Sequence, residues 1–298
     1  MERTSGTILV TGATGTVGAS VMQLLVEDSA PARAGSRDPA AARSMQPGAE
    51  WVAFDMERPG TFASALEGVD RVFLIARPGD DEPERTARPF VEAMRRGDVR
   101  HVVTLSAMGA DRRDDISLGR LEALVEDSGL AWTHLRPNWF MQIFCVSPLV
   151  DAIRATGCIE VPAGDARISW IDARDVAAVS AATLTRPGHA GRAYLLTGAE
   201  ALDHTEVART LSEASGRDVR YRTLDEDEGR RAVLASGLGP RRAERLGRFY
   251  RLVRAGACAP VSTDVATVLG RPPIGFQRFA RAYSHTWLAP SREVAGRA

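Results

Sequence analysis

Apolar and polar residues alternate along the first half of the chain in a pattern that predicts strands and helices in turn. Short apolar runs predict strands at 7–10, 31–34, 51–54, 71–76, 101–105 and 131–135. Between these runs, apolar residues at helical spacing predict helices at 17–25, 84–96 and 118–128. Strands that alternate with helices predict a parallel sheet covered on both faces, which is a Rossmann-type doubly wound α/β fold.

The second half of the chain has more helical periodicity. Residues 168–171 and 193–196 predict two further strands. Asp203 and Glu206 have the spacing of a capping box, which predicts the start of a helix. Residues 226–256 are rich in arginine and also have helical periodicity. This half therefore adds strands and a charged helical region to the first.

Length, charge and cysteine content narrow the class of protein. A chain of 298 residues has room for one large α/β domain, or for a nucleotide-binding domain with a smaller appendage. The net charge of +0 and the lack of a long apolar run predict neither a nucleic-acid partner nor a membrane span. Cys145, Cys158 and Cys258 are widely spaced, which predicts free thiols in a reducing compartment. Because a strand follows closely on Met1, we expect no signal peptide and a cytoplasmic location.

The chain contains no lysine. All 38 basic residues are therefore arginine, and together with the high alanine and glycine content this is typical of a GC-rich bacterial genome. The absence also restricts the chemistry, because no side-chain ammonium group is available to any active site.

Residues 11–18 read TGATGTVG and stand between the first strand and the first helix, where a phosphate-binding turn belongs. Gly12 allows the tight turn, Gly15 lets backbone amides approach a pyrophosphate, and Gly18 lets the helix pack closely on the sheet. The N–H groups at the helix N-terminus favour a bound phosphate. We predict a dinucleotide site formed by Gly12, Thr14, Gly15, Thr16, Val17 and Gly18. A purely structural glycine turn is the alternative.

The end of the second strand indicates which dinucleotide is bound. An NAD site places a carboxylate there for the ribose 2′-hydroxyl, but this chain has Ser36 and Arg37. The forked guanidinium of arginine suits a 2′-phosphate, and Arg33 is placed to assist. We therefore predict NADP (NADPH) as the cofactor. Asp38 keeps NAD open, since a shift of one or two residues would restore a carboxylate.

Three later loops supply further candidate cofactor contacts. Asp55, at the end of the third strand, is placed to bind the adenine amino group, and a solvated loop aspartate is the alternative. Ala76 and Arg77, after the fourth strand, are expected near the ribose and pyrophosphate. Ser106 and Pro137, at the ends of the fifth and sixth strands, complete the predicted cofactor site.

Several stretches of the chain, in order and spacing, resemble the NmrA-like atypical short-chain dehydrogenase/reductases. They are residues 11–18, 34–39 (AGSRDP), 101–110 (HVVTLSAMGA), 128–141 (SGLAWTHLRPNWFM) and 170–177 (WIDARDVA). That family includes quinone oxidoreductase-like and isoflavone-reductase-like enzymes and redox-sensing regulators. The resemblance implies an NADP-binding Rossmann core at 1–150. It also implies a mixed region at 151–298, which returns strands to the sheet and forms a smaller, mostly helical substrate-binding subdomain.

The usual catalytic pair of short-chain dehydrogenases cannot exist here. That pair uses a lysine to lower the pKa of a tyrosine four residues earlier, and this chain has no lysine. Only Tyr250 has a basic residue at the fourth position, Arg254, and arginine is a poor proton carrier. We predict Ser106 and Asn138 as catalytic residues, which would bind a carbonyl and orient the substrate. A hydroxyl satisfied by the backbone is the alternative for Ser106.

The segment after the sixth strand predicts a substrate pocket. Trp139, Phe140 and Met141 would form an apolar aromatic wall beside Asn138, and Met108 would add to it from the preceding loop. Ordinary core packing is the alternative for the three apolar residues. No histidine has metal-ligand spacing, so no metal site is predicted. His134 is expected to be a satisfied core histidine, and Glu122 a solvated helix residue.

Three functions remain open from the sequence. The first is NADPH-dependent hydride transfer to a quinone, enone or aromatic polyketide-like small molecule, which needs mainly placement and exclusion of water. The second is a non-catalytic NADP(H) sensor that regulates a partner. The third is an epimerase or dehydratase that keeps its cofactor bound. We expect a small-molecule substrate and a monomer or homodimer.

Overall fold

The computed structural model describes residues 6–112 and 116–288 of the chain. Contacts within the chain divide it into two compact units. Unit 1 comprises Met1–Asn138, Ala173–Thr197 and Ser262–Pro272, and unit 2 comprises Trp139–Asp172, Gly198–Val261 and Pro273–Ala298. The sequence predicts one domain boundary, after residue 150. In the structure each unit consists of three chain segments, so the chain passes between the units several times.

The central layer of unit 1 is a seven-stranded sheet in the order β3-β2-β1-β4-β5-β6-β8, and all neighbouring strands are parallel. The strands are β1 (Thr7–Val10), β2 (Ala32–Ser36), β3 (Glu50–Ala53), β4 (Val69–Ile75), β5 (His101–Leu105), β6 (Ala131–Pro137) and β8 (Arg192–Leu196). The strand order reverses at β1, so that β1 and β4 flank the crevice in which open α/β sheets bind ligands. The predicted doubly wound parallel sheet is confirmed.

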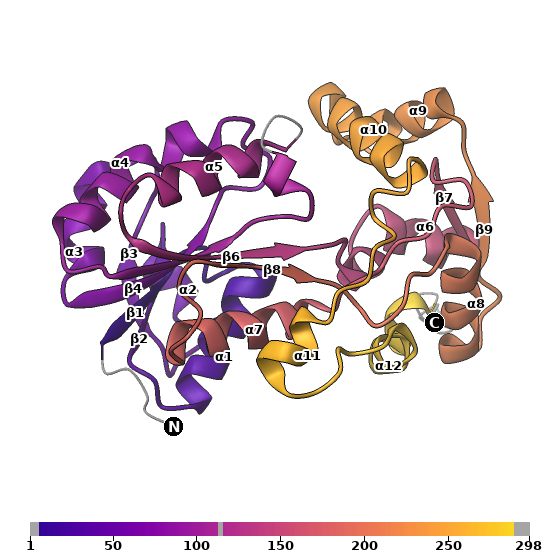
Figure 1. Cartoon of the computed structure of the whole chain (residues 1–298). Helices are drawn as coiled ribbons and strands as arrows, with labels where there is room; N and C mark the ends of the chain where they lie inside the picture. Colours follow the sequence, from indigo (N-terminus) through magenta and orange to yellow (C-terminus); the bar gives the residue numbers. More distant parts are fainter. Residues whose placement is uncertain (1–5, 113–115, 289–298) are drawn as a thin grey trace, which may run out of the picture. The chain divides into compact units, whose positions relative to one another are not determined.

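Helices cover both faces of this sheet (Figure 1). One face carries α1 (Thr16–Glu27) and α7 (Ala173–Thr185), which pack against each other. The other carries α3 (Phe62–Leu66), α4 (Pro83–Arg96) and α5 (Ser117–Glu126). Two short helices, α2 (Pro39–Ala42) and α11 (Asp264–Leu269), complete the unit. Both faces are covered because successive side chains of a strand point to opposite sides, and here both sets are apolar.

The core beneath α3, α4 and α5 is built from alternate strand residues. Leu9 of β1, Val72 and Leu74 of β4, and Val102 of β5 pack with the apolar sides of these helices. Within that core three phenylalanine rings contact one another, at Phe54, Phe62 and Phe90. This packing holds the loops after β3 and β4 in place at the carboxyl edge of the sheet.

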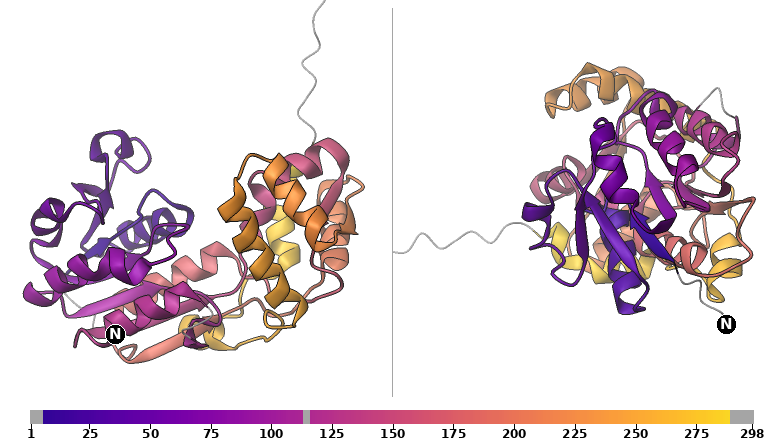
Figure 2. Two further views of the ribbon diagram at one scale, coloured as in Figure 1. Left: turned by 90° about the horizontal axis from the view of Figure 1, so that it is seen from above. Right: turned by 90° about the vertical axis from the view of Figure 1, so that its left-hand side faces the viewer.

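Unit 2 is smaller and mostly helical. It contains a two-stranded parallel sheet of β7 (Cys158–Val161) and β9 (Arg220–Thr223). Its helices are α6 (Leu149–Thr156), α8 (His204–Ser215), α9 (Glu226–Ala235), α10 (Pro240–Arg254) and α12 (Phe276–Ala282). Helices α9 and α10 lie against each other (Figure 2). The core is aromatic, and the indole N–H of Trp287 donates to the backbone carbonyl of Phe144 at 2.7 Å.

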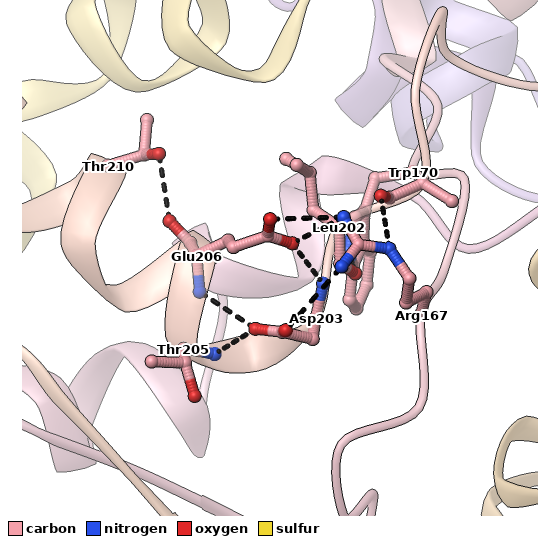
Figure 3. Close-up of polar contacts among 8 residues, drawn as sticks. Arg167, Trp170, Leu202, Asp203, Thr205, Glu206 and Thr210 are labelled. Atoms are coloured by element: carbon pink, nitrogen blue, oxygen red, sulfur yellow. Dashed lines mark hydrogen bonds and ion pairs between the residues drawn. The ribbon is translucent and has the colours of Figure 1, made fainter.

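The predicted capping box at the start of α8 is confirmed (Figure 3). The Asp203 carboxylate accepts backbone N–H groups of Thr205 and Glu206, and the Glu206 carboxylate accepts the N–H of Asp203 at 2.9 Å. Arg167 adds an ion pair to Glu206 at 2.8 Å, and the Trp170 indole N–H donates to the Leu202 carbonyl. The start of α8 is therefore tied to the segment before Trp170.

Several details differ from the sequence prediction. Strand β6 continues to Pro137, since a proline at the end of a strand can still accept hydrogen bonds. The strand predicted at 168–171 is wrong, because Ile168 and Ile171 form single bridges with different partners. The helical region at 226–256 is two helices, α9 and α10, separated at Gly237 and Gly239, which have positive φ. Helix α6 and strands β7 and β9 were not predicted.

Among the described residues, no helix has both the length and the apolar character that crossing a bilayer requires.

Candidate functional site

The residue that opens the glycine-rich turn ties β1 to β4. The Thr11 hydroxyl donates to the Phe73 carbonyl at 2.9 Å and accepts the Ile75 N–H at 2.8 Å. The backbone N–H of Thr11 also donates to Phe73. Thr11 is buried, so these bonds are shielded from water and fix the start of the turn beside the crevice. The sequence motif contains Thr11, but this bridging role is seen only in the fold.

Gly12 and Gly18 are required by the geometry of the turn. Gly12 has a φ of +62°, a conformation that favours glycine. A Cβ added to Gly18 would lie 2.2 Å from the Gly12 carbonyl oxygen, far inside van der Waals contact. That carbonyl accepts the Gly15 N–H at 3.0 Å and so closes the turn. Any side chain at residue 18 would therefore displace the glycine-rich turn itself.

The outer surface of the turn is open. Gly12, Thr14, Gly15 and Thr16 are exposed, whereas Val17 is buried against the sheet. Gly15 is the N-cap of α1 and has no side chain to cap the helix, and the first turn contains no acidic residue. The N–H groups of this first turn are thus available to an anion, which the helix dipole favours. The residues present fit a dinucleotide pyrophosphate.

At the end of β2 the two charged side chains have different environments. Among the described residues, the exposed Arg37 guanidinium has no hydrogen-bond or ion-pair partner. The Asp38 carboxylate instead accepts the Ala41 N–H at 3.0 Å and caps α2. The Asp38 N–H donates to the Ser36 hydroxyl at 3.1 Å. Arginine, and not aspartate, is therefore the side chain without a structural task at this position.

The expectation that Arg33 assists Arg37 is wrong in this structure. The Arg33 guanidinium forms an ion pair with Glu50 at 2.7 Å and donates to the backbone carbonyl of Glu67 at 2.9 Å. These bonds tie β2 to β3 and to the end of α3. Arg33 lies within β2, whereas Arg37 lies in the loop after it. Only Arg37 is therefore placed at the carboxyl edge of the sheet.

The loops after β3 and β4 contact each other through a surface ion pair. Arg77 pairs with Glu57 at 2.7 Å, and both side chains are half exposed. Asp55 accepts the Glu57 N–H at 3.1 Å and so shapes the loop after β3. Its carboxylate is partly buried, with Arg58 3.5 Å away. Ala76 is half-buried at the end of β4. The cofactor roles predicted for Asp55, Ala76 and Arg77 stay predictions.

Ser106, directly after β5, has an unusual environment for a hydroxyl. The residue is 4% exposed, and its Oγ makes no hydrogen bond within the described part of the chain. Its backbone N–H donates to the Leu135 carbonyl at 2.8 Å, which fixes Ser106 against β6. A buried hydroxyl without a partner is costly in free energy, so the atom is available to a ligand. The alternative, a hydroxyl satisfied by the backbone, does not describe this structure.

The loop after β5 and the end of β6 are joined by backbone bonds. The N–H of Met108, which is half-buried, donates to the Pro137 carbonyl at 2.9 Å. The buried Asn138 donates its N–H to Leu196 of β8 at 2.9 Å. Unit 1 thus brings Ser106, Met108, Pro137 and Asn138 to the carboxyl ends of β5 and β6. Their predicted catalytic and binding roles stay predictions.

The apolar wall predicted after β6 belongs to unit 2. Met141 is 1% exposed and lies in the core of that unit, which matches the alternative of ordinary packing. Phe140 is half-buried and bridges to Ile171. Trp139 is also half-buried, and its ring lies 6.5 Å from the ring of Phe249. Of the predicted wall, Trp139 and Phe140 are therefore partly exposed, and their role in a substrate pocket stays a prediction.

Glu122 was misjudged from the sequence alone, whereas His134 lies in the core as predicted. Glu122 is buried, not solvated, and accepts from Arg136 Nε at 3.0 Å and Nη2 at 2.6 Å. His134 is buried as expected, with Nε2 3.4 Å from the Glu126 carboxylate, and burial lowers the pKa of the imidazole. Helix α5 and strand β6 meet only in the fold, so the sequence carried no signal of this network.

The same network brings three potential metal ligands together. Ligand atoms of Glu122, Glu126 and His134 lie within 4.8 Å of one another. Both oxygens of Glu122 are already bound to the Arg136 guanidinium, whose charge opposes a cation at the same place. We therefore assign these residues to ion pairing between α5 and β6.

Three tyrosines, Tyr194, Tyr221 and Tyr250, are shifted away from acid or base chemistry near neutral pH. Burial raises the pKa of Tyr194, Tyr221 and Tyr250 above the ordinary value. Tyr250, the one with arginine four residues later, lies in the core of unit 2. The Arg254 side chain donates to the Pro162 carbonyl instead. The structure thus offers no substitute for the tyrosine and lysine pair on these three side chains.

Comparison with known proteins identifies the family. Residues 12–187 match the family model described as NAD(P)H-binding, which covers the glycine-rich turn and most of unit 1. The chain belongs to this NAD(P)H-binding family. The NAD(P)H azoreductase of Xenophilus azovorans is 37% identical over 282 residues, which cover 93% of this chain and 98% of the relative.

Solved structures agree with this assignment. The NADPH-dependent quinone oxidoreductase of Escherichia coli, in complex with NADPH, is 26% identical with a TM-score of 0.83, covering 92% of this chain and 99% of that chain. A variant of NmrA is 17% identical with a TM-score of 0.74, covering 93% and 94%, and shows the shared fold. The NmrA-like resemblance is confirmed, and the family member described here is an NAD(P)H-dependent oxidoreductase.

Proposed function

We propose that this oxidoreductase uses NADPH to reduce a small quinone, enone or aromatic acceptor. The observation that carries the cofactor preference is the contrast at the end of β2, where the exposed Arg37 has no partner in the described part of the chain and Asp38 caps α2. A guanidinium can bind a 2′-phosphate in two hydrogen bonds, whereas a carboxylate would repel it.

The residues of unit 1 supply binding and placement. The open first turn of α1 and the Gly12–Gly15 turn would hold the pyrophosphate, and Arg37 the 2′-phosphate. When bound, NADPH supplies the hydride. The Ser106 hydroxyl, buried and without a partner among residues 6–112 and 116–288, would donate a hydrogen bond to the acceptor carbonyl or to the nicotinamide amide. With no lysine in the chain, the proton that balances hydride transfer comes from water.

The acceptor class is proposed from relatives and from the missing acid. One relative is named as an azoreductase and one structural neighbour as a quinone oxidoreductase. Azo groups and quinones are electron-poor, so they accept hydride without strong prior protonation. A simple ketone needs an acid at the carbonyl, which this chain does not supply through a tyrosine and lysine pair.

The test is NADPH oxidation by the purified protein with a panel of small quinones, azo compounds and simple ketones. We expect turnover with quinones or azo compounds and at least tenfold less with ketones. Ser106→Ala should lower kcat about tenfold, as for loss of one neutral hydrogen bond worth about 1 kcal/mol. Thr104→Ala is the matched control, because the Thr104 hydroxyl is also buried and makes no hydrogen bond to any described residue, but lies within β5.

Each outcome decides between readings. Faster turnover of ketones than of quinones would overturn the acceptor class. Tight NADPH binding without turnover on any acceptor would overturn the reductase function and favour the sensor. Equal effects of the Ser106 and Thr104 substitutions would show that the Ser106 hydroxyl acts only on stability.

A further inference from the structure

Helix α10 of unit 2 has an excess of positive charge. It contains six arginines and one glutamate, Glu244. Two of the arginines, Arg251 and Arg254, pair with Glu226 of α9. Among the described residues, the exposed guanidinium groups of Arg241, Arg242 and Arg248 have no hydrogen-bond or ion-pair partner. Like charges at helical spacing repel one another, so an anion bound here would reduce the repulsion between these arginines.

The burial pattern of α10 shows how these arginines are arranged. Ala243, Tyr250 and Val253 form the buried side of the helix. Arg242 and Phe249 are seven residues apart, about two turns, and therefore share one flank. Arg245 lies one turn before Phe249 on the border of that flank. Arg241 and Arg248 share another side, rotated by about 100° from the first.

The flank with Arg242 is also the aromatic one. Phe249 is one of the few large apolar side chains exposed in the described structure, at 38%. Its ring meets the Trp139 ring edge-on at 6.5 Å, and Trp139 lies 5.3 Å from the Tyr250 ring. Trp139 follows Asn138 directly in the chain and remains half-buried. An exposed aromatic ring on the same helix flank as a guanidinium favours a planar aromatic anion over a simple ion.

We propose that the flank of α10 formed by Arg242, Arg245 and Phe249, with Trp139 beside it, binds aromatic acceptors that carry an oxyanion. The ring of the substrate would pack on Phe249 and Trp139. Its sulfonate, phosphate or carboxylate group would accept hydrogen bonds from Arg242. This assignment rests on the proposed reductase function and specifies its substrate class.

Two matched pairs of compounds test the proposal. The first pair consists of two acceptors, 1,2-naphthoquinone and its 4-sulfonate, used with saturating NADPH. We expect Arg242→Gln to lower kcat/KM for the sulfonate about tenfold and to leave that for the neutral quinone within about twofold. Arg248→Gln removes the same charge from the other side of the helix and should change neither value by more than twofold. Raising the salt concentration should lower the preference of the unmodified protein for the sulfonate over the neutral quinone.

The second pair consists of non-reducible ligands, naphthalene-2-sulfonate and neutral naphthalene-2-sulfonamide, titrated by calorimetry. We expect the sulfonate to bind more tightly to the unmodified protein and to lose that advantage in Arg242→Gln. Phe249→Ala should weaken both ligands. Circular dichroism confirms that each variant is folded, which is expected because Arg242 and Phe249 are exposed.

The outcomes separate this proposal from the proposed function. Reduction of the neutral quinone without any preference for the sulfonate leaves the reductase intact and overturns the α10 site. Sulfonate binding that depends on Arg242, with no turnover of either quinone, supports the site and overturns the reductase. Equal effects of the Arg242 and Arg248 substitutions would show a general charge effect of the helix, which also overturns the site.

Discussion

Arg37 and Asp38 are neighbours in the chain, yet their side chains have different tasks. The Asp38 carboxylate is held by the Ala41 N–H, and this bond stabilises the start of α2. Arg37 has no structural bond among the described residues and projects from the end of β2. Asp38, whose carboxylate leaves NAD as an alternative cofactor in the sequence analysis, therefore already has a structural hydrogen bond in the fold.

Arg37→Ala should weaken NADPH binding about tenfold to a hundredfold, because a charge-assisted contact to the 2′-phosphate is lost. NADH binding should change less than twofold, since NADH lacks that phosphate. Fluorescence titration with both nucleotides measures the two effects. Arg95→Ala is the control, because Arg95 is exposed in the last turn of α4, which leads to the amino end of β5 and not to the carboxyl ends of the strands. An equal loss for both nucleotides would contradict the 2′-phosphate assignment.

His204 shows how burial of one residue makes the stability of the protein depend on pH. The imidazole is buried at the start of α8, stacked on Tyr221 at 5.1 Å and edge-on to Trp170 at 5.4 Å. Burial lowers the pKa of His204 to about 4 from an unfolded value of 6.5. The unfolded chain therefore binds the proton first as the pH falls, so the stabilisation is full above 6.5 and is lost toward pH 4.

His204→Phe should remove about 2 kcal/mol of the loss in unfolding free energy between pH 7 and pH 5, because the aromatic contacts remain and the titrating group is gone. Urea unfolding at both pH values measures the difference. His285→Phe, the same substitution at an exposed position, is the control. The same slope for His204→Phe as for the unmodified protein would show that His204 is not the titrating group.

At the scale of elements, the turn between β1 and α1 depends on a close approach of two backbone segments. The Gly12 carbonyl closes the turn through the Gly15 N–H and lies where a Cβ of residue 18 would be. The pairing of Thr11 with β4 holds the other end of the turn. The turn therefore cannot shift to accommodate a side chain without loss of these bonds.

Gly18→Ala should lower the unfolding free energy by roughly 2–4 kcal/mol and abolish detectable binding of both nucleotides, because overpacking displaces the turn. Urea unfolding and fluorescence titration measure the two effects. Gly60→Ala is the control, since nothing lies within 4 Å of a Cβ there and its φ is not positive. Retained NADPH binding in Gly18→Ala would show that the turn is not the phosphate site.

At the scale of the whole molecule, the predicted cofactor contacts all lie in unit 1, at the carboxyl ends of its strands. A ligand that binds only the folded protein stabilises it in proportion to the logarithm of its concentration. The two units give separate reporters of this effect, since each has its own core.

NADPH at a hundred times its dissociation constant should raise the unfolding free energy by about 2.7 kcal/mol. Hydrogen exchange should slow most at residues 11–18 and least at α8 and β9 of unit 2. Thermal unfolding and peptide-level exchange measured by mass spectrometry check both statements. Protection confined to unit 2 would contradict the placement of the cofactor site.

Local patterns in the sequence determined the strands of unit 1 and its helices α1, α4 and α5, the glycine-rich turn and the capping box of α8. These features depend on the spacing of a few neighbouring residues, so they can be predicted without knowledge of the fold. The alternating strands and helices also determined the parallel sheet, because short connections and right-handed crossovers leave few other topologies.

Only the tertiary structure decided the partners of side chains that meet across elements. The bond from Arg33 to Glu50, the burial of Glu122 under Arg136, and the Ser106 hydroxyl, which has no partner among the described residues, all depend on residues distant in sequence. The same holds for Phe249 beside Trp139, which is separated from it by much of unit 2. Hydrogen bonding and burial are set by three-dimensional neighbours, which one-dimensional spacing does not specify.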